Sequence, residues 1–130
     1  MAQHTTNYTD TFIAVAPDCP ATVAEVPPER ATPSVARIQY DMLADAPYAH
    51  TSDDVVHASQ GERRGIDRDT FFAKGQACLR ASPLVKRYGW GLHHDAEGRV
   101  ALVPVESTEY AAFLADDALE HRAGMRSSRA

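Results

Sequence analysis

The residues best suited to chemistry are concentrated in one stretch of the chain, residues 74–91. Within its 18 positions this stretch contains one cysteine, four cationic residues, two aromatic residues and three glycines. If the chain is extended from Cys78 onward, the side chains of Cys78, Arg80 and Ser82 point to the same face. The pair Ser82-Pro83 predicts that a helical turn begins there, with Ser82 as its cap. A guanidinium beside free helix N–H groups is typical of a site for a carboxylate or a phosphate.

We therefore expect this segment to bind an anionic small molecule or a protein partner. Arg80 and Lys86 would supply positive charge, with Arg87 beside them, Ser82 a hydroxyl, and Trp90 a stacking face. The alternative interpretation is structural: Arg80 holds neighbouring loops, Lys86 and Arg87 are solvated, and Trp90 packs in the core. The stretch has neither the Gly-Lys-Ser/Thr ending of a phosphate loop nor a Gly-x-Gly-x-x-Gly pattern.

Cys78 also raises the alternative of a thiol-dependent enzyme. A thiol near a guanidinium and a helix start has a lowered pKa and attacks electrophiles more readily. Its general base would be His93 or His94, provided that the following strand passes nearby. A third class, a structural or interaction subunit without a ligand site, also stays open.

The sequence indicates no metal site and no cofactor. The chain has six histidines, but none of them forms a His-x-x-x-His or His-Glu-x-x-His pattern. His93 and His94 are adjacent, so on a strand they face opposite sides of the sheet. One histidine with a neighbouring carboxylate does not define a metal site.

Composition narrows the classes of partner and the compartment. The chain has 130 residues, a formal net charge of −5 and a pI near 5.6, which disfavours general nucleic-acid binding. The cluster formed by Arg63, Arg64 and Arg68 is interrupted by acidic residues and is interpreted as a solvated loop. No apolar run is long enough to span a membrane, and the first residues do not resemble a secretory signal. We expect a cytoplasmic protein whose two cysteines, Cys19 and Cys78, are free thiols.

Periodicity and turn residues predict a single α+β domain over residues 1–130, with flexible termini. Helices are expected from a Thr32-Pro33 start to about Asp45, from an Asp67 cap through Phe72, for one turn after Ser82, and after a Ser107 cap. Strands are expected at 11–16, 54–59 and 77–82, with a loop at 60–65, and Asp117 with Glu120 is expected to cap a further short turn.

The clearest element is a β-hairpin near the C-terminal end of the chain. Residues 88–94 and 99–105 are rich in β-forming residues, and Asp95-Ala96-Glu97-Gly98 is a turn between them. Pro104 lacks a backbone donor, which favours an edge strand that is compatible with a homodimer. An antiparallel sheet with helices packed mainly on one face follows from this pattern.

Several short motifs together resemble a small bacterial family of unknown function. They include Thr5-Thr6-Asn7-Tyr8, Thr51-Ser52-Asp53-Asp54 and, most specifically, the Cys-Leu-Arg-x-Ser-Pro-Leu-x-Lys-Arg-Tyr-Gly-Trp-Gly segment that begins at Cys78. The resemblance covers nearly the whole chain. It implies that the segment from Cys78 to Gly91 is characteristic of the family, and it implies no activity, cofactor or catalytic residue.

Overall fold

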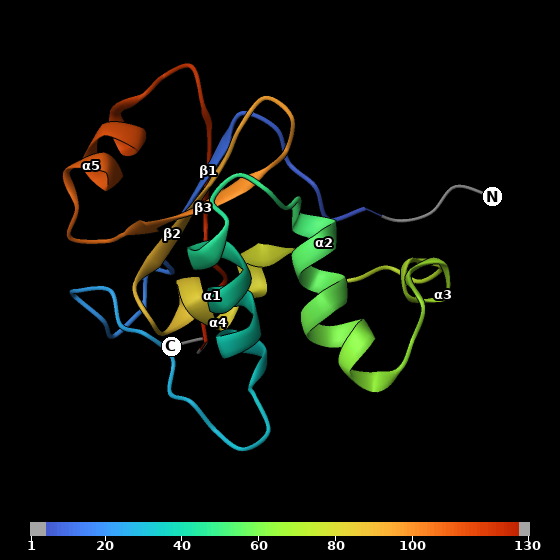
Figure 1. The fold of residues 1–130 in the computed structure, drawn as a ribbon. Coiled ribbons are helices and arrows are strands. Elements are labelled where there is room, and N and C mark those ends of the chain that lie inside the picture. Colours follow the sequence, from blue (N-terminus) through green and yellow to red (C-terminus); the bar gives the residue numbers. More distant parts are fainter. Residues whose placement is uncertain (1–4, 128–130) are drawn as a thin grey trace.

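The centre of the molecule is a four-stranded sheet with the strand order β3-β2-β1-β4. The computed structural model describes residues 5–127, and Figure 1 shows helices on both sides of the sheet. The strands are β1 (Thr11–Ala14), β2 (Trp90–His94), β3 (Val100–Pro104) and β4 (Glu120–Ala123). β1 pairs antiparallel with β2, and β2 antiparallel with β3, whereas β4 is parallel to β1. The α+β class is confirmed, and the sheet is mixed rather than purely antiparallel.

The predicted hairpin is present as β2 and β3. Leu92 lies opposite Leu102 in its register. The Asp95 carboxylate accepts hydrogen bonds from the backbone N–H groups of Glu97 and Arg99, each at 2.9 Å. Gly98 has a φ of 80°, a left-handed conformation that glycine adopts without strain. β3 forms one edge of the sheet, as the position of Pro104 predicted.

Most helices begin at a side-chain cap. Their bounds are α1 (Val35–Asp45), α2 (Ser52–Val56), α3 (Arg68–Phe72), α4 (Pro83–Lys86) and α5 (Thr108–Ala115). The predicted caps Asp67, Ser82 and Ser107 each accept a hydrogen bond from a backbone N–H of the first turn. The cap of α1 is Ser34 rather than Thr32, because the Ser34 hydroxyl accepts from the Arg37 N–H.

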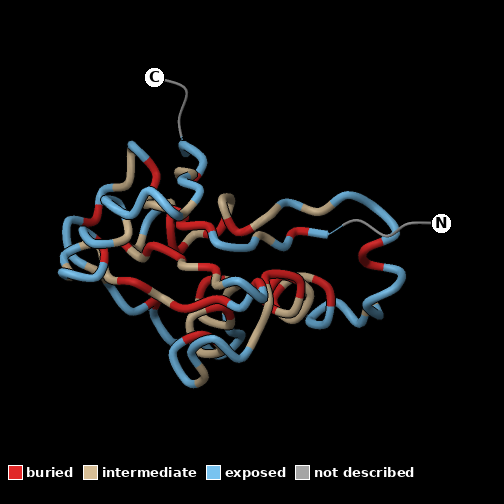
Figure 2. The backbone as a smooth tube through the Cα atoms, turned by 90° about the horizontal axis from the view of Figure 1, so that it is seen from above, coloured by how far each residue is buried: buried red, intermediate tan, exposed pale blue. Residues whose placement is uncertain are grey.

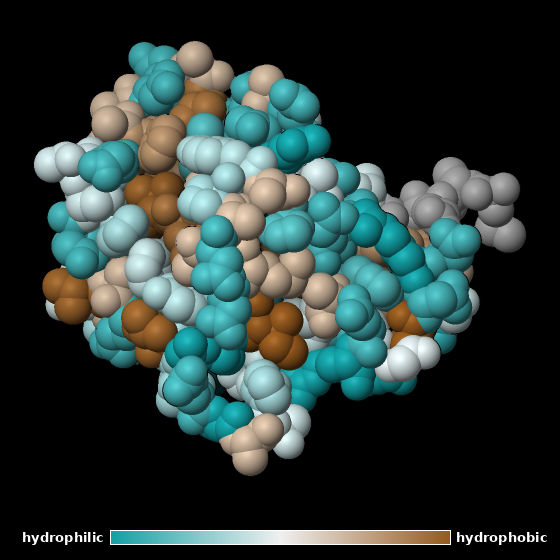
Figure 3. Space-filling model, viewed as in Figure 1, coloured by the Kyte–Doolittle hydropathy of each residue, from teal (hydrophilic) through white to brown (hydrophobic). Residues whose placement is uncertain are grey.

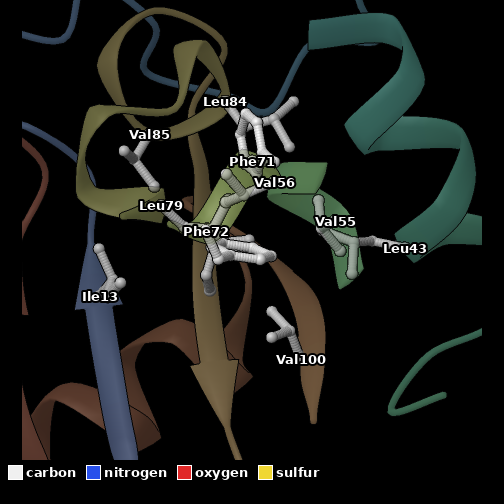
Figure 4. Close-up of a cluster of buried hydrophobic side chains, with 11 residues drawn as sticks. Ile13, Leu43, Val55, Val56, Phe71, Phe72, Leu79, Leu84, Val85 and Val100 are labelled. Carbon is white, nitrogen blue, oxygen red and sulfur yellow. The ribbon is translucent and has the colours of Figure 1, made fainter. Parts of the chain in front are cut away.

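Two hydrophobic clusters cover the two faces of the sheet. The larger cluster joins Ile13 and Leu92 to residues of α1, α2, α3 and α4, and Figure 4 shows most of its side chains. On the other face, Phe12 and Val103 pack against Tyr110 of α5. Gly91 makes this contact possible, because a Cβ there would lie 2.8 Å from Phe12 and 2.9 Å from Tyr110. The helices therefore lie mainly on one face, and buried segments gather between the layers in Figure 2.

The prediction of a strand at 54–59 is wrong. Thr51 forms a capping box with Asp54, so the chain turns into α2, and the buried Val55 and Val56 pack as helical residues. α2 then continues without a break into a π-helical turn at His57–Gly61 and a 3₁₀ turn at Glu62–Arg64. The predicted loop at 60–65 is therefore mostly helical. β-branched residues favour strands only weakly against such a strong start signal.

Two further predictions need correction. Residues 79–81 form a 3₁₀ turn rather than an extended segment, because Ser82 donates its N–H to the carbonyl of Leu79 at 3.0 Å. Near the C-terminus, the turn is stabilised by the carboxylate of Asp116 rather than Asp117, and the chain then enters β4. α5 crosses the sheet from the β3 edge to the β1 side, so β4 can join β1 in parallel. The polar sequence of β4 carries no strand signal.

The prediction of flexible termini concerns residues 1–4 and 128–130 in part, and these lie outside the described residues. Met125 donates its N–H to the carbonyl of Arg80, and Ser127 donates to the Asp18 carboxylate. Within residues 5–127, no helix is both long enough and apolar enough to cross a bilayer.

Candidate functional site

The structure gives Arg80 a backbone partner. Its Nε donates to the carbonyl of Ala123 at 2.7 Å, and its own carbonyl accepts from Met125 at the same distance. These bonds attach the end of β4 and the chain after it to the 3₁₀ turn. Arg80 therefore fixes the C-terminal segment, and it does not share an exposed face with Ser82.

Ser82 is buried, with 4% of its surface exposed. Its hydroxyl donates to the Gln39 side-chain carbonyl at 2.5 Å and accepts from the Leu84 N–H at 3.1 Å. The Gln39 amide in turn donates to the Ser59 hydroxyl at 3.1 Å. This buried chain of polar groups links α1, α4 and the π-helical turn. It satisfies the hydroxyl that the sequence assigned to a ligand.

Trp90 also contacts other parts of the protein, through both its indole N–H and its ring. Its indole N–H donates to the carbonyl of Glu25 at 2.7 Å, and its ring lies 5.5 Å from the ring of Tyr40. Tyr88 accepts the Glu25 N–H with its carbonyl at 2.8 Å. Trp90 thus holds residues 17–31, which we call the proline-rich loop, against α1.

Lys86 and Arg87 line a cavity of about 340 Å³ at the start of α1, which we call the basic cavity. A third cation, Arg30, enters it from the proline-rich loop. The first turn of α1 forms another wall, with Ser34, Val35 and Ala36, and the remaining lining comes from Ala81, Pro83 and Tyr88. The volume is at the lower end of the range for small-molecule sites, roughly 300–1,000 Å³.

The electrostatics of the basic cavity favour an anion. Among the described residues, none that lines it is acidic, and Arg30, Lys86 and Arg87 form no ion pair there. α1 has no acidic residue in its first turn. A helix start leaves backbone N–H groups without helical partners and carries a partial positive charge. Three cations and this helix end therefore face one small volume.

Cys78 lies in a different cluster. Its Sγ is 3.1 Å from the Tyr8 hydroxyl. The Tyr8 ring meets the ring of His94 edge-on at 5.5 Å, and the Arg122 guanidinium lies over it at 5.4 Å. Burial, followed by the hydrogen bond with Cys78, raises the pKa of Tyr8. The phenol is therefore protonated at neutral pH and can donate to the sulfur.

The two adjacent histidines have different surroundings. His94 is fully buried, and neither ring nitrogen has a hydrogen-bond partner among the described residues. Burial lowers the pKa of His94 to about 4. His93 faces α5, where it stacks on Phe113 at 4.2 Å, and its Nδ1 lies 2.7 Å from the Tyr48 hydroxyl. Only His94 is on the same side of the sheet as Cys78.

The N-terminal motif has a structural role. The Asp53 carboxylate accepts from the Thr5 hydroxyl at 2.8 Å, from the Thr6 N–H at 2.6 Å and from the Thr6 hydroxyl at 2.7 Å. The Asn7 side chain accepts the Asp53 N–H at 2.9 Å. These contacts hold residues 5–7 against the start of α2, and they place Tyr8 over His94.

Sequence reasoning did not connect Arg30 or the first turn of α1 with a binding site. Arg30 lies in an irregular loop that has no periodicity, so only the tertiary structure shows that it lines the same cavity as Lys86. The helix start itself was predicted, but with its cap at Thr32 rather than Ser34 and without a role in a site. No group of three or more His, Cys, Asp or Glu side chains within residues 5–127 is arranged to hold a metal ion.

The comparisons with known proteins give one match. Residues 3–130 match the model of a family described as a family of unknown function (DUF6157). No curated protein and no solved structure matches the chain.

Proposed function

We propose that this chain, which belongs to the family of unknown function DUF6157, binds a small anionic molecule in the basic cavity. The observation that carries the proposal is the meeting of Arg30, Lys86 and Arg87 with the start of α1 around about 340 Å³. A phosphate-bearing ligand fits best, because its several oxygens accept both helix N–H groups and cationic donors.

The location of the cations supports a specific site over a general attraction. The protein carries a net charge of −5, so its overall field repels an anion, and only a local group of cations can attract one. On the face of the molecule that Figure 3 shows, hydrophobic areas form separate patches between hydrophilic ones. This pattern does not favour a broad apolar interface on that face. Of the residues that the sequence assigned to an anionic ligand, Lys86 and Arg87 line the basic cavity, and Arg30 joins them there.

A thiol-dependent activity at Cys78 is the second candidate. The observation that favours it is the contact of the thiol with the Tyr8 hydroxyl at 3.1 Å, with the unpartnered His94 behind the same ring. His94 is neutral at pH 7 because burial lowers its pKa to about 4. Alkylation of Cys78 in a Cys19→Ser background tests this candidate. A rate no faster than that of an ordinary free cysteine at neutral pH contradicts it.

We further propose a location in the bacterial cytoplasm, where Cys19 and Cys78 would stay free thiols. A homodimer through β3 stays a prediction. Part of that edge is already covered, because Val100 donates to the carbonyl of His50 and its own carbonyl accepts from Tyr48.

The proposed function is tested by titrating inorganic phosphate into the protein calorimetrically at fixed ionic strength. The variant is Lys86→Gln/Arg87→Gln. The charge-matched control is Lys74→Gln/Arg126→Gln, since both of these residues are exposed and neither lines the cavity. An exposed charge contributes about 0.5–1 kcal/mol, so losing two should weaken binding roughly 10-fold. Equal losses in variant and control, or no binding by the native protein, would contradict the proposal.

A further inference from the structure

A second hollow adjoins the basic cavity at the first turn of α1. It has a volume of about 410 Å³ and is lined by Val35, Gln60, Arg63 and Arg64. Val35 lines both hollows, so they meet at this side chain. The two arginines come from the 3₁₀ turn Glu62–Arg64, which follows the π-helical turn packed against α1. A ligand seated at the start of α1 can therefore reach either hollow.

The second hollow is also cationic. Arg64 donates its Nε to the carbonyl of Gln60 at 2.9 Å, which fixes the side chain on its own turn and leaves the outer guanidinium nitrogens to other partners. Within residues 5–127, neither Arg63 nor Arg64 forms an ion pair. Glu62, in the same turn, is exposed and does not line the hollow. Two groups of cations thus flank Val35 in a protein of net charge −5.

We propose that the ligand carries two anionic groups joined by a short neutral spacer, and that it is a bisphosphorylated small molecule. One phosphate group occupies the basic cavity, the other lies against Arg63 and Arg64, and the spacer crosses Val35. This inference rests on the proposed function, because the first group uses the same cations and helix start.

Joining the two groups makes the binding of the second one intramolecular. Its effective concentration on a short spacer is in the millimolar range or above, so even a weak second site increases affinity. The gain disappears when the spacer is too short to reach across Val35. A bisphosphorylated ligand should therefore bind at least about 10-fold more tightly than its single-phosphate counterpart, with an optimum spacer length.

The test compares methylphosphonate with a series of α,ω-alkane bisphosphonates of increasing spacer length, titrated calorimetrically at fixed ionic strength. The variant is Arg63→Gln/Arg64→Gln, and Lys74→Gln/Arg126→Gln is again the charge-matched control. We expect the best bisphosphonate to bind at least 10-fold more tightly than methylphosphonate to the native protein. In the variant this advantage should fall to about the twofold statistical factor of a ligand with two equal ends, with methylphosphonate affinity unchanged. Arg63→Gln alone should lose part of it, and it leaves the Arg64 to Gln60 bond intact.

Two results overturn the inference in distinguishable ways. If methylphosphonate binds but no bisphosphonate exceeds its affinity by more than the twofold statistical factor, or if the variant keeps the advantage, the two-group ligand is excluded while the basic cavity remains an anion site. If no probe binds the native protein, both the inference and the proposed function fail.

Discussion

His94 should make folding stability depend strongly on pH. An ordinary histidine has a pKa near 6.5, and burial lowers that of His94 to about 4 in the folded protein. Below pH 6.5 the unfolded chain binds a proton that the folded protein does not, so stability is fully present above pH 6.5 and falls as the pH approaches 4. The two pKa values correspond to a total loss of about 3 kcal/mol, of which about 2.5 kcal/mol is lost at pH 4.5.

The assay is urea denaturation of the native protein, His94→Phe and His94→Leu at pH 7.5 and pH 4.5. His93 also has a pKa lowered mainly by burial, so it contributes in the same direction to all three proteins. The comparison therefore isolates His94: both variants should lose about 2.5 kcal/mol less than the native protein over this range. The difference does not depend on how well either side chain fits the site. Identical losses in all three proteins would refute the reasoning.

Three further substitutions test the packing that positions the site, each by urea denaturation at pH 7.5. Gln39→Ala removes the partner of the buried Ser82 and Ser59 hydroxyls, so we expect a loss of about 2–4 kcal/mol, and a loss below 1 would mean that water replaces the amide. Asp53→Ala removes the acceptor of three hydrogen bonds from the N-terminal segment and should cost about 3 kcal/mol; an unchanged midpoint would show that this segment contributes nothing. Gly91→Ala inserts a methyl group against two aromatic rings and should cost about 1–3 kcal/mol, unless α5 can move away freely.

Local signals in the sequence predicted the elements that are determined locally. The caps at Asp67, Ser82 and Ser107 and the turn before Gly98 act over three or four residues, and all are present. β4 could not be predicted, because its four polar residues become a strand only through pairing with β1 over a separation of more than a hundred residues. The region after Asp54 was misassigned because the prediction rested on two β-branched residues and did not take the capping box of Thr51 and Asp54 into account.

The candidate site was predicted only in part, for a related reason. Lys86 ends, and Arg87 follows, a helical turn that the sequence identifies, so their position at the surface was foreseeable. The partners of Arg80 and Ser82 come from β4 and α1, which are distant in sequence, so their structural roles could not be read from the segment itself. Arg30 joins the cavity for the same kind of reason: its loop is held by Trp90 and Arg37 through backbone carbonyls.

The most direct test of the central claim is a phosphate titration followed by ¹H–¹⁵N correlation spectra at constant ionic strength. An anion at the start of α1 accepts hydrogen bonds from its first N–H groups. We predict that the amide signals of Val35 and Ala36 shift most and saturate, together with those of Lys86 and Arg87. Shifts that are absent at Val35 and Ala36, or that are centred on another part of the protein, would contradict the basic cavity as the anion site.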